Sequence, residues 1–249
     1  MNGKTVTNSV PWKYRWSHQG GVHRAVVKAG NRVLSTVPMH VKYSATTKLK
    51  GRALPYRLIA GDVAVQVGAP YDTLYAGRSR AAHLGMAAGA DGGLIVVEPF
   101  AKSCEIFEDF ARKHLPCETV VINAGAWSES GEIQLEVDES HPATNFSSGT
   151  VDYSDERMSS YRSVSVRSDT LDALVSEAGL GAPELVSITT NWAELEILSG
   201  TSELRESGLR YISLALGEAN RDYQTEMRSL GYSLVGHEDR GATYERQTS

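Results

Sequence analysis

Apolar and polar residues follow a regular order over most of the chain, from residue 61 onward. Short runs rich in Val, Ile and Leu are typical of buried strands. Between them lie longer stretches whose apolar residues recur every three or four positions, as on one face of a helix. This order predicts an α/β fold with a mostly parallel sheet and helices on both of its faces.

The expected elements can be placed on the sequence from this pattern. Strands are predicted over 62–69, 92–100, 118–127, 183–190 and 209–216. Helices are predicted over 72–90 (with Asp72 as N-cap), 102–115, 168–180 (with a Ser or Asp cap), 193–208 and 219–231. The final strands, 232–238 and 242–247, flank Asp239-Arg240-Gly241, which indicates an antiparallel hairpin.

Two segments do not fit the central pattern. The strand 131–137 (GEIQLEV) need not belong to the central sheet, and the chain has no internal repeat. Residues 141–160 are rich in Ser, Thr and Gly and are expected as a long loop, with a short strand over 161–166. Loops of that length in compact domains are often functional.

The first 60 residues have weak periodicity. We expect a short helix broken at Gly30 over 24–37 and an extended segment over 40–50. The predicted organisation is therefore a basic N-terminal arm or cap, 1–60, followed by one domain, 61–249.

The charge distribution separates these two parts. The net charge of −5 comes from eleven Lys and Arg with no acid before residue 62, and from fourteen basic and thirty acidic residues after it. Aromatic residues are interleaved with the basic ones in Val10–Trp16 (VPWKYRW). This mixture suits an anionic membrane surface or a polyanion. Equally, the arm could lie on its own acidic body.

Bulk features limit the cellular setting. No apolar run approaches the ~20 residues needed to cross a bilayer, and no secretory signal is visible, so no transmembrane segment is expected. Cys104 and Cys117 provide neither a disulfide framework nor metal-ligand spacing. These features favour a reducing cytoplasm, with the protein peripheral to a membrane if the arm binds one.

Candidate chemistry lies where the predicted parallel strands end, because such sheets hold ligands outside the carboxyl ends of their strands. Gly68 follows the first strand and would let a ligand approach the backbone, although a plain turn explains it as well. Glu98 ends the second strand, thirty residues later, and could accept the hydroxyls of a ribose or remain solvated. Phe100 and Trp127 could flank an adenine ring or pack in the core.

These features, in this order, resemble the FkbM-type S-adenosylmethionine-dependent methyltransferases. The resemblance lies in DVAVQVGAPYDTLY, LIVVEPF, VVINAGAWSESGEIQL, SDTLDALVSEAGLGAPELVSITTNWAELEILSG and the final LGYSLVG, over roughly the last 190 residues. It implies a Rossmann-like class I methyltransferase fold, with a seven-stranded sheet that ends in an antiparallel hairpin. The basic arm lies outside the resemblance.

The resemblance also implies a cofactor and a site. The cofactor is S-adenosylmethionine, the acceptor is a hydroxyl of a sugar, glycan or small metabolite, and no metal is implied. Cofactor-binding positions would be Gln66, Gly68, Ala69, Tyr71, Glu98, Phe100, Asn123 and Ala124. Glu194 would be the base that removes the acceptor proton, with Thr189 and Asn191 orienting the acceptor. Alternatively, Glu194 only favours the positive end of its helix.

Several positions depart from the family's pattern. Gln66 stands where members have Asp, Pro70 where they have Asn, and Asp72 where they have the last Gly. In the fourth-strand motif, Thr189 replaces Asp, Asn191 replaces Glu and Trp192 replaces Gly. Two rival functions follow: a degenerate methyltransferase fold that acts as a binding or scaffold module through its arm, and a nicotinamide oxidoreductase. The second lacks its glycine-rich loop, since Gly68 is the only glycine from 68 to 73.

The arm generates the first prediction. If its charge meets an anionic surface, binding to anionic vesicles or polyanions falls steeply as salt is added. Deletion of residues 1–55 then abolishes that binding and leaves cofactor affinity intact, as measured by vesicle sedimentation and calorimetry. Collapse of the fold on deletion would instead show that the arm covers the acidic body.

Overall fold

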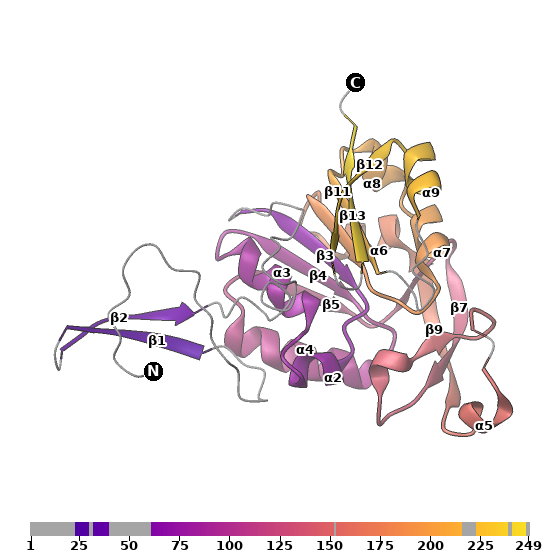
Figure 1. Ribbon diagram of the computed structural model, residues 1–249, viewed down its shortest axis with the longest axis horizontal. Coiled ribbons are helices and arrows are strands. Elements are labelled where there is room, and N and C mark those ends of the chain that lie inside the picture. Colours follow the sequence, from indigo (N-terminus) through magenta and orange to yellow (C-terminus); the bar gives the residue numbers. More distant parts are fainter. Residues whose placement is uncertain are drawn as a thin grey trace.

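A seven-stranded sheet forms the centre of the protein, in the order β12-β13-β11-β10-β3-β4-β5 (Figure 1). The computed structural model describes residues 23–29, 32–39, 61–151, 153–215, 223–238 and 241–247. The strands are β3 Val63–Val67, β4 Gly93–Val97, β5 Glu118–Ile122, β10 Leu185–Ile188, β11 Tyr211–Ala215, β12 Tyr232–Glu238 and β13 Gly241–Arg246. Each lies where the apolar pattern predicts a strand.

The pairing of these strands confirms the predicted fold class. Neighbours from β11 through β10, β3 and β4 to β5 are parallel, whereas β13 is antiparallel to both β11 and β12. The sheet is therefore mostly parallel and ends in an antiparallel hairpin, as in the Rossmann-like methyltransferase fold. Its strand order reverses at β3, which has the second strand on one side and the fourth on the other.

Helices cover both faces of the sheet. On one face, α2 Tyr71–Tyr75, α3 Arg80–Ala88 and α4 Ala101–His114 pack on Ala64, Leu94 and Val96. On the other, α6 Leu171–Ala178, α7 Glu194–Ser199, α8 Ser202–Glu206 and α9 Gln224–Ser229 pack on the alternate positions Val65, Ile95 and Val97. Strand side chains point alternately to the two faces, so each strand contributes to both apolar layers.

Two predicted helices are each divided into two. The helix predicted over 72–90 is interrupted at Gly77, whose φ is +65°, and Ser79 caps the second piece by accepting from the amide of Ala82. The helix predicted over 193–208 is interrupted at Gly200, where an added Cβ would lie 2.3 Å from the carbonyl oxygen of Trp127. The break at Gly77 thus goes with a left-handed backbone conformation, and the break at Gly200 with close contact to neighbouring backbone. Helical periodicity reports neither.

Two predicted helix caps are also wrong. The residue before α2 is Pro70, and Asp72 lies inside the helix, where its Oδ1 accepts from the amide of Thr73 at 2.9 Å. Helix α6 is capped by Thr170, whose hydroxyl accepts from the amide of Ala173, and by neither Ser168 nor Asp169.

A second, smaller sheet lies beside the first, in the order β6-β9-β7-β8. Its strands are β6 Gly125–Trp127, β7 Gly131–Val137, β8 Phe146–Ser147 and β9 Arg162–Thr170. The predicted strand 131–137, whose sheet the sequence left open, thus belongs to this second sheet as β7. Residues predicted as one long loop contain the 3₁₀-helix η1 Pro142–Thr144, β8 and α5 Asp155–Met158.

The N-terminal region requires one correction. Residues 24–37 do not form a broken helix, because β1 His23–Ala29 and β2 Arg32–Met39 pair as antiparallel strands. The β-branched residues of both segments favour strands, and the Gly30-Asn31 sequence between them is typical of hairpin loops. The rest of the predicted arm, including the extended segment 40–50, lies outside the described residues.

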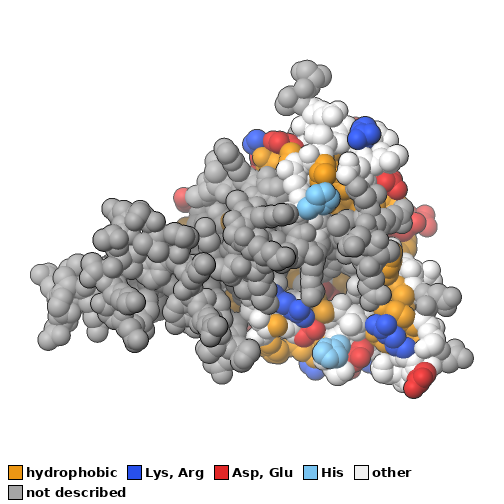
Figure 2. All heavy atoms as spheres, viewed as in Figure 1, with side chains coloured by type: hydrophobic (Ala, Val, Ile, Leu, Met, Phe, Trp, Pro, Cys, Tyr) orange, Lys and Arg blue, Asp and Glu red, His pale blue; other side chains and the backbone are white. Residues whose placement is uncertain are grey.

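The surface view is consistent with the mixed composition of the body. Figure 2 shows basic and acidic side chains interspersed over the described part of this face. Among the described residues, no helix is long and apolar enough to cross a membrane. Both cysteines are free and buried, in agreement with the prediction that Cys104 packs as a small apolar residue.

Candidate active site

A small cavity lies at the carboxyl ends of β3, β4 and β10, where the strand order reverses. Its volume is about 70 Å³. The central sheet contributes Val67, Gly68, Glu98, Thr189, Thr190 and Asn191, and the second sheet and its loops contribute Trp127, Ile133, Leu135, Asn145, Phe146 and Ser147 to the wall. Open α/β sheets bind their ligands at this kind of crevice.

Gly68 is required by the backbone as well as by any ligand. Its φ is +83°, a conformation that glycine adopts without cost. An added Cβ would lie 2.3 Å from the carbonyl oxygen of Thr189, at the end of the neighbouring strand. A larger residue at this position would therefore collide with the end of β10, so its effect on ligand binding could not be separated from its effect on the fold.

Glu98 is buried, with only 5% of its surface exposed, so the alternative of a solvated strand-end acid is wrong. One carboxylate oxygen accepts from the amide of Ala69 at 2.7 Å and the other from the amide of Phe100 at 2.9 Å. Burial raises the pKa of Glu98 to about 7, although these two amide bonds act in the opposite direction. The carboxylate thus joins the loop after β3 to the start of α4.

Gln66 lies fully buried beneath the cavity. Its Nε2 donates to the hydroxyl of Thr189 at 2.7 Å and to the carbonyl oxygens of Val67 and Gly68 at 2.7 and 2.9 Å. Its Oε1 is buried and has no hydrogen-bond partner among the described residues. A neutral amide therefore occupies the floor of the site, with one acceptor unused.

Of the eight predicted cofactor residues, Gly68 and Glu98 line the cavity and six do not: Gln66, Ala69, Tyr71, Phe100, Asn123 and Ala124. Asn123 donates its Nδ2 to the carbonyl oxygens of Glu98 and Pro99, at 3.0 and 2.9 Å, and so fixes the end of β4. Ala124 is buried in the core. The rings of Tyr71 and Phe100 face each other with centroids 6.5 Å apart. Trp127 lines the cavity, whereas Phe100 does not.

The predicted catalytic residues separate into two groups. Thr189 and Asn191 line the cavity, as does Thr190, which was not predicted. Glu194 is fully buried and does not line it. Its carboxylate accepts from the hydroxyls of Thr190 and Tyr223, each at 3.0 Å, and burial raises its pKa. Glu194 therefore reaches the cavity only through the hydroxyl of Thr190.

Trp192 occupies a strained position next to this group. Its φ is +73°, and it is the one non-glycine residue among those described with a positive φ. Large side chains rarely adopt this conformation, which glycine adopts freely. The backbone has thus kept the shape of a glycine position although the side chain has changed.

The sequence did not predict the residues that close the cavity from the second sheet. Asn145, Phe146 and Ser147 belong to no motif, and their position depends on how the second sheet folds back over the first. The only signal was the polar loop 141–160, which had been marked as functional from its length. Asn145 is notable because its Nδ2 is buried without a partner among the described residues.

Comparison with known proteins gives likeness of fold. No protein-family model matches the chain, and no curated protein is significantly similar to it. Similar solved structures include the methyltransferase FkbM from Methylobacillus flagellatus KT, which is 11% identical over 76% of this chain and 44% of that one, with a TM-score of 0.48. This chain therefore spans less than half of that protein's length.

Two further structures are similar at the same level. A fibrillarin/Nop5p complex is 12% identical over 83% of this chain and 81% of that one, with a TM-score of 0.42. A TehB-like S-adenosylmethionine-dependent methyltransferase from Corynebacterium glutamicum ATCC 13032 Kitasato is 10% identical over 82% and 88%, with a TM-score of 0.36. At these values the likeness does not establish function, which has to be argued from the site.

The raised pKa of Glu98 predicts a specific dependence of stability on pH. Between its ordinary value of 4.5 and about 7, the folded protein keeps a proton that the unfolded chain has released. The free energy of unfolding therefore falls as pH rises through this range, by up to about 3 kcal/mol. In Glu98→Gln this contribution is lost. Urea unfolding from about pH 5 to about pH 8 measures it, and equal slopes in both proteins would contradict it.

Gly68→Ala should destabilise the fold by about 2 kcal/mol or more, because strain and the contact with Thr189 both act. Gly61→Ala is the matched control, since Gly61 has φ +101° but an added Cβ there meets nothing within 4 Å. Its cost should be about 1 kcal/mol. Equal losses in the two variants, measured by denaturant unfolding, would show that the contact with β10 is unimportant.

Proposed function

We propose that the protein binds S-adenosylmethionine at this cavity and transfers its methyl group to a hydroxyl oxygen of a sugar or other small molecule. The observation that carries the proposal is the pairing of Gly68 and Glu98. A glycine with positive φ and a buried carboxylate lie together at the point where the strand order reverses. Parallel α/β sheets use such a point to hold nucleoside-containing ligands.

The donors and acceptors of the cavity suit this cofactor in kind. Glu98 has free lone pairs beside the two amide bonds that it accepts, and can receive the hydroxyls of a ribose. Trp127, Leu135 and Phe146 supply apolar surface for a base. Gln66 offers its unused Oε1 beneath the loop, where it could accept from an ammonium group.

When bound, the cofactor would supply an activated methyl group on sulfur. In the transfer the carbon–sulfur bond breaks, the carbon–oxygen bond forms and the acceptor hydroxyl loses its proton. Positioning of the acceptor in line with the methyl group contributes most in such a reaction. We assign this positioning to Thr189 and Thr190, which line the cavity, because Asn191 already donates to the carbonyl oxygens of Ala143 and Asn145.

Glu194 would be the final proton acceptor. The hydroxyl of Thr190, which lies between Glu194 and the cavity, would give its own proton to the carboxylate as it takes up the proton of the acceptor hydroxyl. Tyr223 donates to the second carboxylate oxygen and would hold the group in one orientation. Because burial raises the pKa of Glu194, this carboxylate is more basic than an exposed one.

The arm extends the proposal to a location. Its eleven Lys and Arg residues and interleaved aromatics would hold the protein at an anionic surface in the cytoplasm. The rival proposal, a binding module without turnover, is favoured by the replacement of acids at Gln66, Thr189 and Asn191. Binding of the cofactor without methyl transfer to any hydroxyl acceptor would support that rival.

Calorimetric titration with S-adenosylhomocysteine tests the proposed function directly. The wild-type protein should bind it, and Glu98→Ala should weaken binding by about 1.5 to 3 kcal/mol, the range for a hydrogen bond to a charged group. Glu177→Ala, which removes an exposed carboxylate paired with Arg167, is the control and should bind like wild type. Failure of the wild-type protein to bind would reject the cofactor proposal.

A further inference from the structure

One segment closes the cavity from the side of the second sheet. Residues 138–147, which we name the strap, run from the end of β7 through η1 to β8. Half of the strap lines the cavity, through Pro142, Ala143, Asn145, Phe146 and Ser147. A cavity of about 70 Å³ is far below the roughly 300–1,000 Å³ of small-molecule sites, so a nucleoside-sized ligand needs more room, which lifting of the strap would provide.

Asn191 holds the middle of the strap. Its Nδ2 donates to the carbonyl oxygen of Ala143 at 3.0 Å and to that of Asn145 at 2.7 Å. Asn191 follows β10 of the central sheet, so these two bonds join the strap to the rigid part of the site. The hydroxyl of Thr150 lies 3.4 Å from the carbonyl oxygen of Asn191 and supports the loop from the opposite direction.

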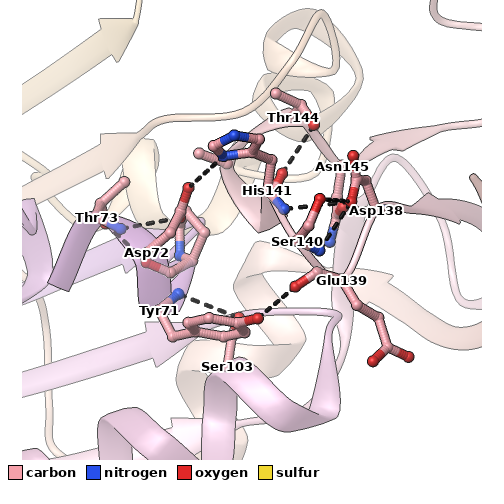
Figure 3. Close-up of polar contacts among 12 residues, drawn as sticks. Tyr71, Asp72, Thr73, Ser103, Asp138, Glu139, Ser140, His141, Thr144 and Asn145 are labelled. Atoms are coloured by element: carbon pink, nitrogen blue, oxygen red, sulfur yellow. Dashed lines mark hydrogen bonds and ion pairs between the residues drawn. The ribbon is translucent and has the colours of Figure 1, made fainter. Parts of the chain in front are cut away.

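A second attachment lies at the helix that follows the cofactor loop, as Figure 3 shows. The hydroxyl of Tyr71 donates to the carbonyl oxygen of Glu139. His141 Nδ1 lies 3.9 Å from Asp72 Oδ2, although the imidazole is largely exposed. The strap therefore bridges α2 and β10, the two elements between which a cofactor would pass.

The strap is itself an ordered unit. The side-chain oxygen of Asn145 accepts from the amide of Asp138 at 2.8 Å, which ties its two ends together. Asp138 in turn accepts from the amide and hydroxyl of Ser140, at 2.8 and 2.6 Å. Because these bonds are internal, they would persist if the bonds to Asn191 and Tyr71 broke. The strap is also held from the second sheet, where Tyr161 donates to the hydroxyl of Thr144 at 2.8 Å and Arg162 pairs with Glu139 at 2.9 Å, so it would swing from that side.

We propose that the strap is a lid over the ligand cavity and that Asn191 is its latch. The residue type supports this role. The side-chain amide of Asn191 has two N–H donors for the two carbonyl oxygens of the strap. The family's pattern has a glutamate at this position, and its carboxylate has no donor when ionised and would repel both carbonyl oxygens. Asn191 is thus a positioning residue. It stands where the family's pattern has a charged glutamate, and its neutral amide holds the strap closed. The latch itself does not depend on the proposed function.

Hydrogen exchange measured by mass spectrometry on the full chain tests the latch. In Asn191→Ala the amides of 138–147 should exchange about tenfold faster, since the loss of two hydrogen bonds of about 0.7 kcal/mol each removes about 1.4 kcal/mol. Asn191→Asp, which has the same shape without the donors, should accelerate exchange at least as much. A peptide containing β4 should keep the wild-type rate in both variants.

Asn123→Ala provides the matched control. Asn123 lies at the same edge of the sheet and its Nδ2 also donates to two carbonyl oxygens, but both belong to residues outside the strap. Its removal should leave exchange of the strap unchanged. The proposal is overturned if Asn191→Asp exchanges like wild type, or if Asn123→Ala accelerates the strap as much as Asn191→Ala does.

A second readout links the latch to ligand access and rests on the proposed function. The association rate of S-adenosylhomocysteine, followed by stopped-flow tryptophan fluorescence, should rise about tenfold in Asn191→Ala if opening of the strap limits entry. An unchanged rate in a variant whose strap exchanges faster would overturn the role in access. If the wild-type protein does not bind this ligand, the cofactor proposal fails while hydrogen exchange still decides the latch.

Discussion

The site depends on one buried carboxylate. Glu98 accepts from the amides of Ala69 and Phe100, which belong to segments thirty residues apart in the chain. It thereby holds the turn after β3 against the start of α4. The carboxyl group, whether ionised or protonated, lies in an apolar surrounding. Burial of an ionised group is costly unless hydrogen bonds compensate, and the two amides provide that compensation. The approach of Gly68 to β10 depends on the same local geometry.

The altered residues of the site change charge in a coordinated way. Gln66 and Thr189 replace two acids of the FkbM pattern and bond to each other, with Nε2 and Oγ1 2.7 Å apart. Two carboxylates at that distance, close to Glu98, would repel one another unless a cation lay between them. The neutral pair is stable without a ligand. A cofactor with an ammonium group would therefore find less electrostatic attraction here, and more of its binding would have to come from Glu98 and from closure of the cavity.

The second sheet closes the cavity. Strands β7 and β9 carry the strap to a place above the ends of β3 and β10, where Asn191 and Tyr71 meet it. Asn191 was predicted to orient an acceptor, but its Nδ2 donates to two carbonyl oxygens of the strap. Asn145 differs from Asn191 in which side-chain atom it uses. Its side-chain oxygen accepts a hydrogen bond within the strap, and its buried Nδ2 has no partner among the described residues. The polar groups left for a ligand therefore come from both sheets.

The sequence alone determined the fold class and the sheet edge at which the candidate residues gather. Apolar runs at Val63–Val67 and Gly93–Val97 fix strands because burial on both faces requires them, and parallel strands bring Gly68, Glu98 and Thr189 to one edge. The tertiary structure decided what these residues do. Contacts between distant segments buried Glu194 behind Thr190, divided a helix at Gly200, and turned Asn191 toward the strap. Local pattern carries no information on such contacts, because each depends on where a second, separately folded element comes to rest.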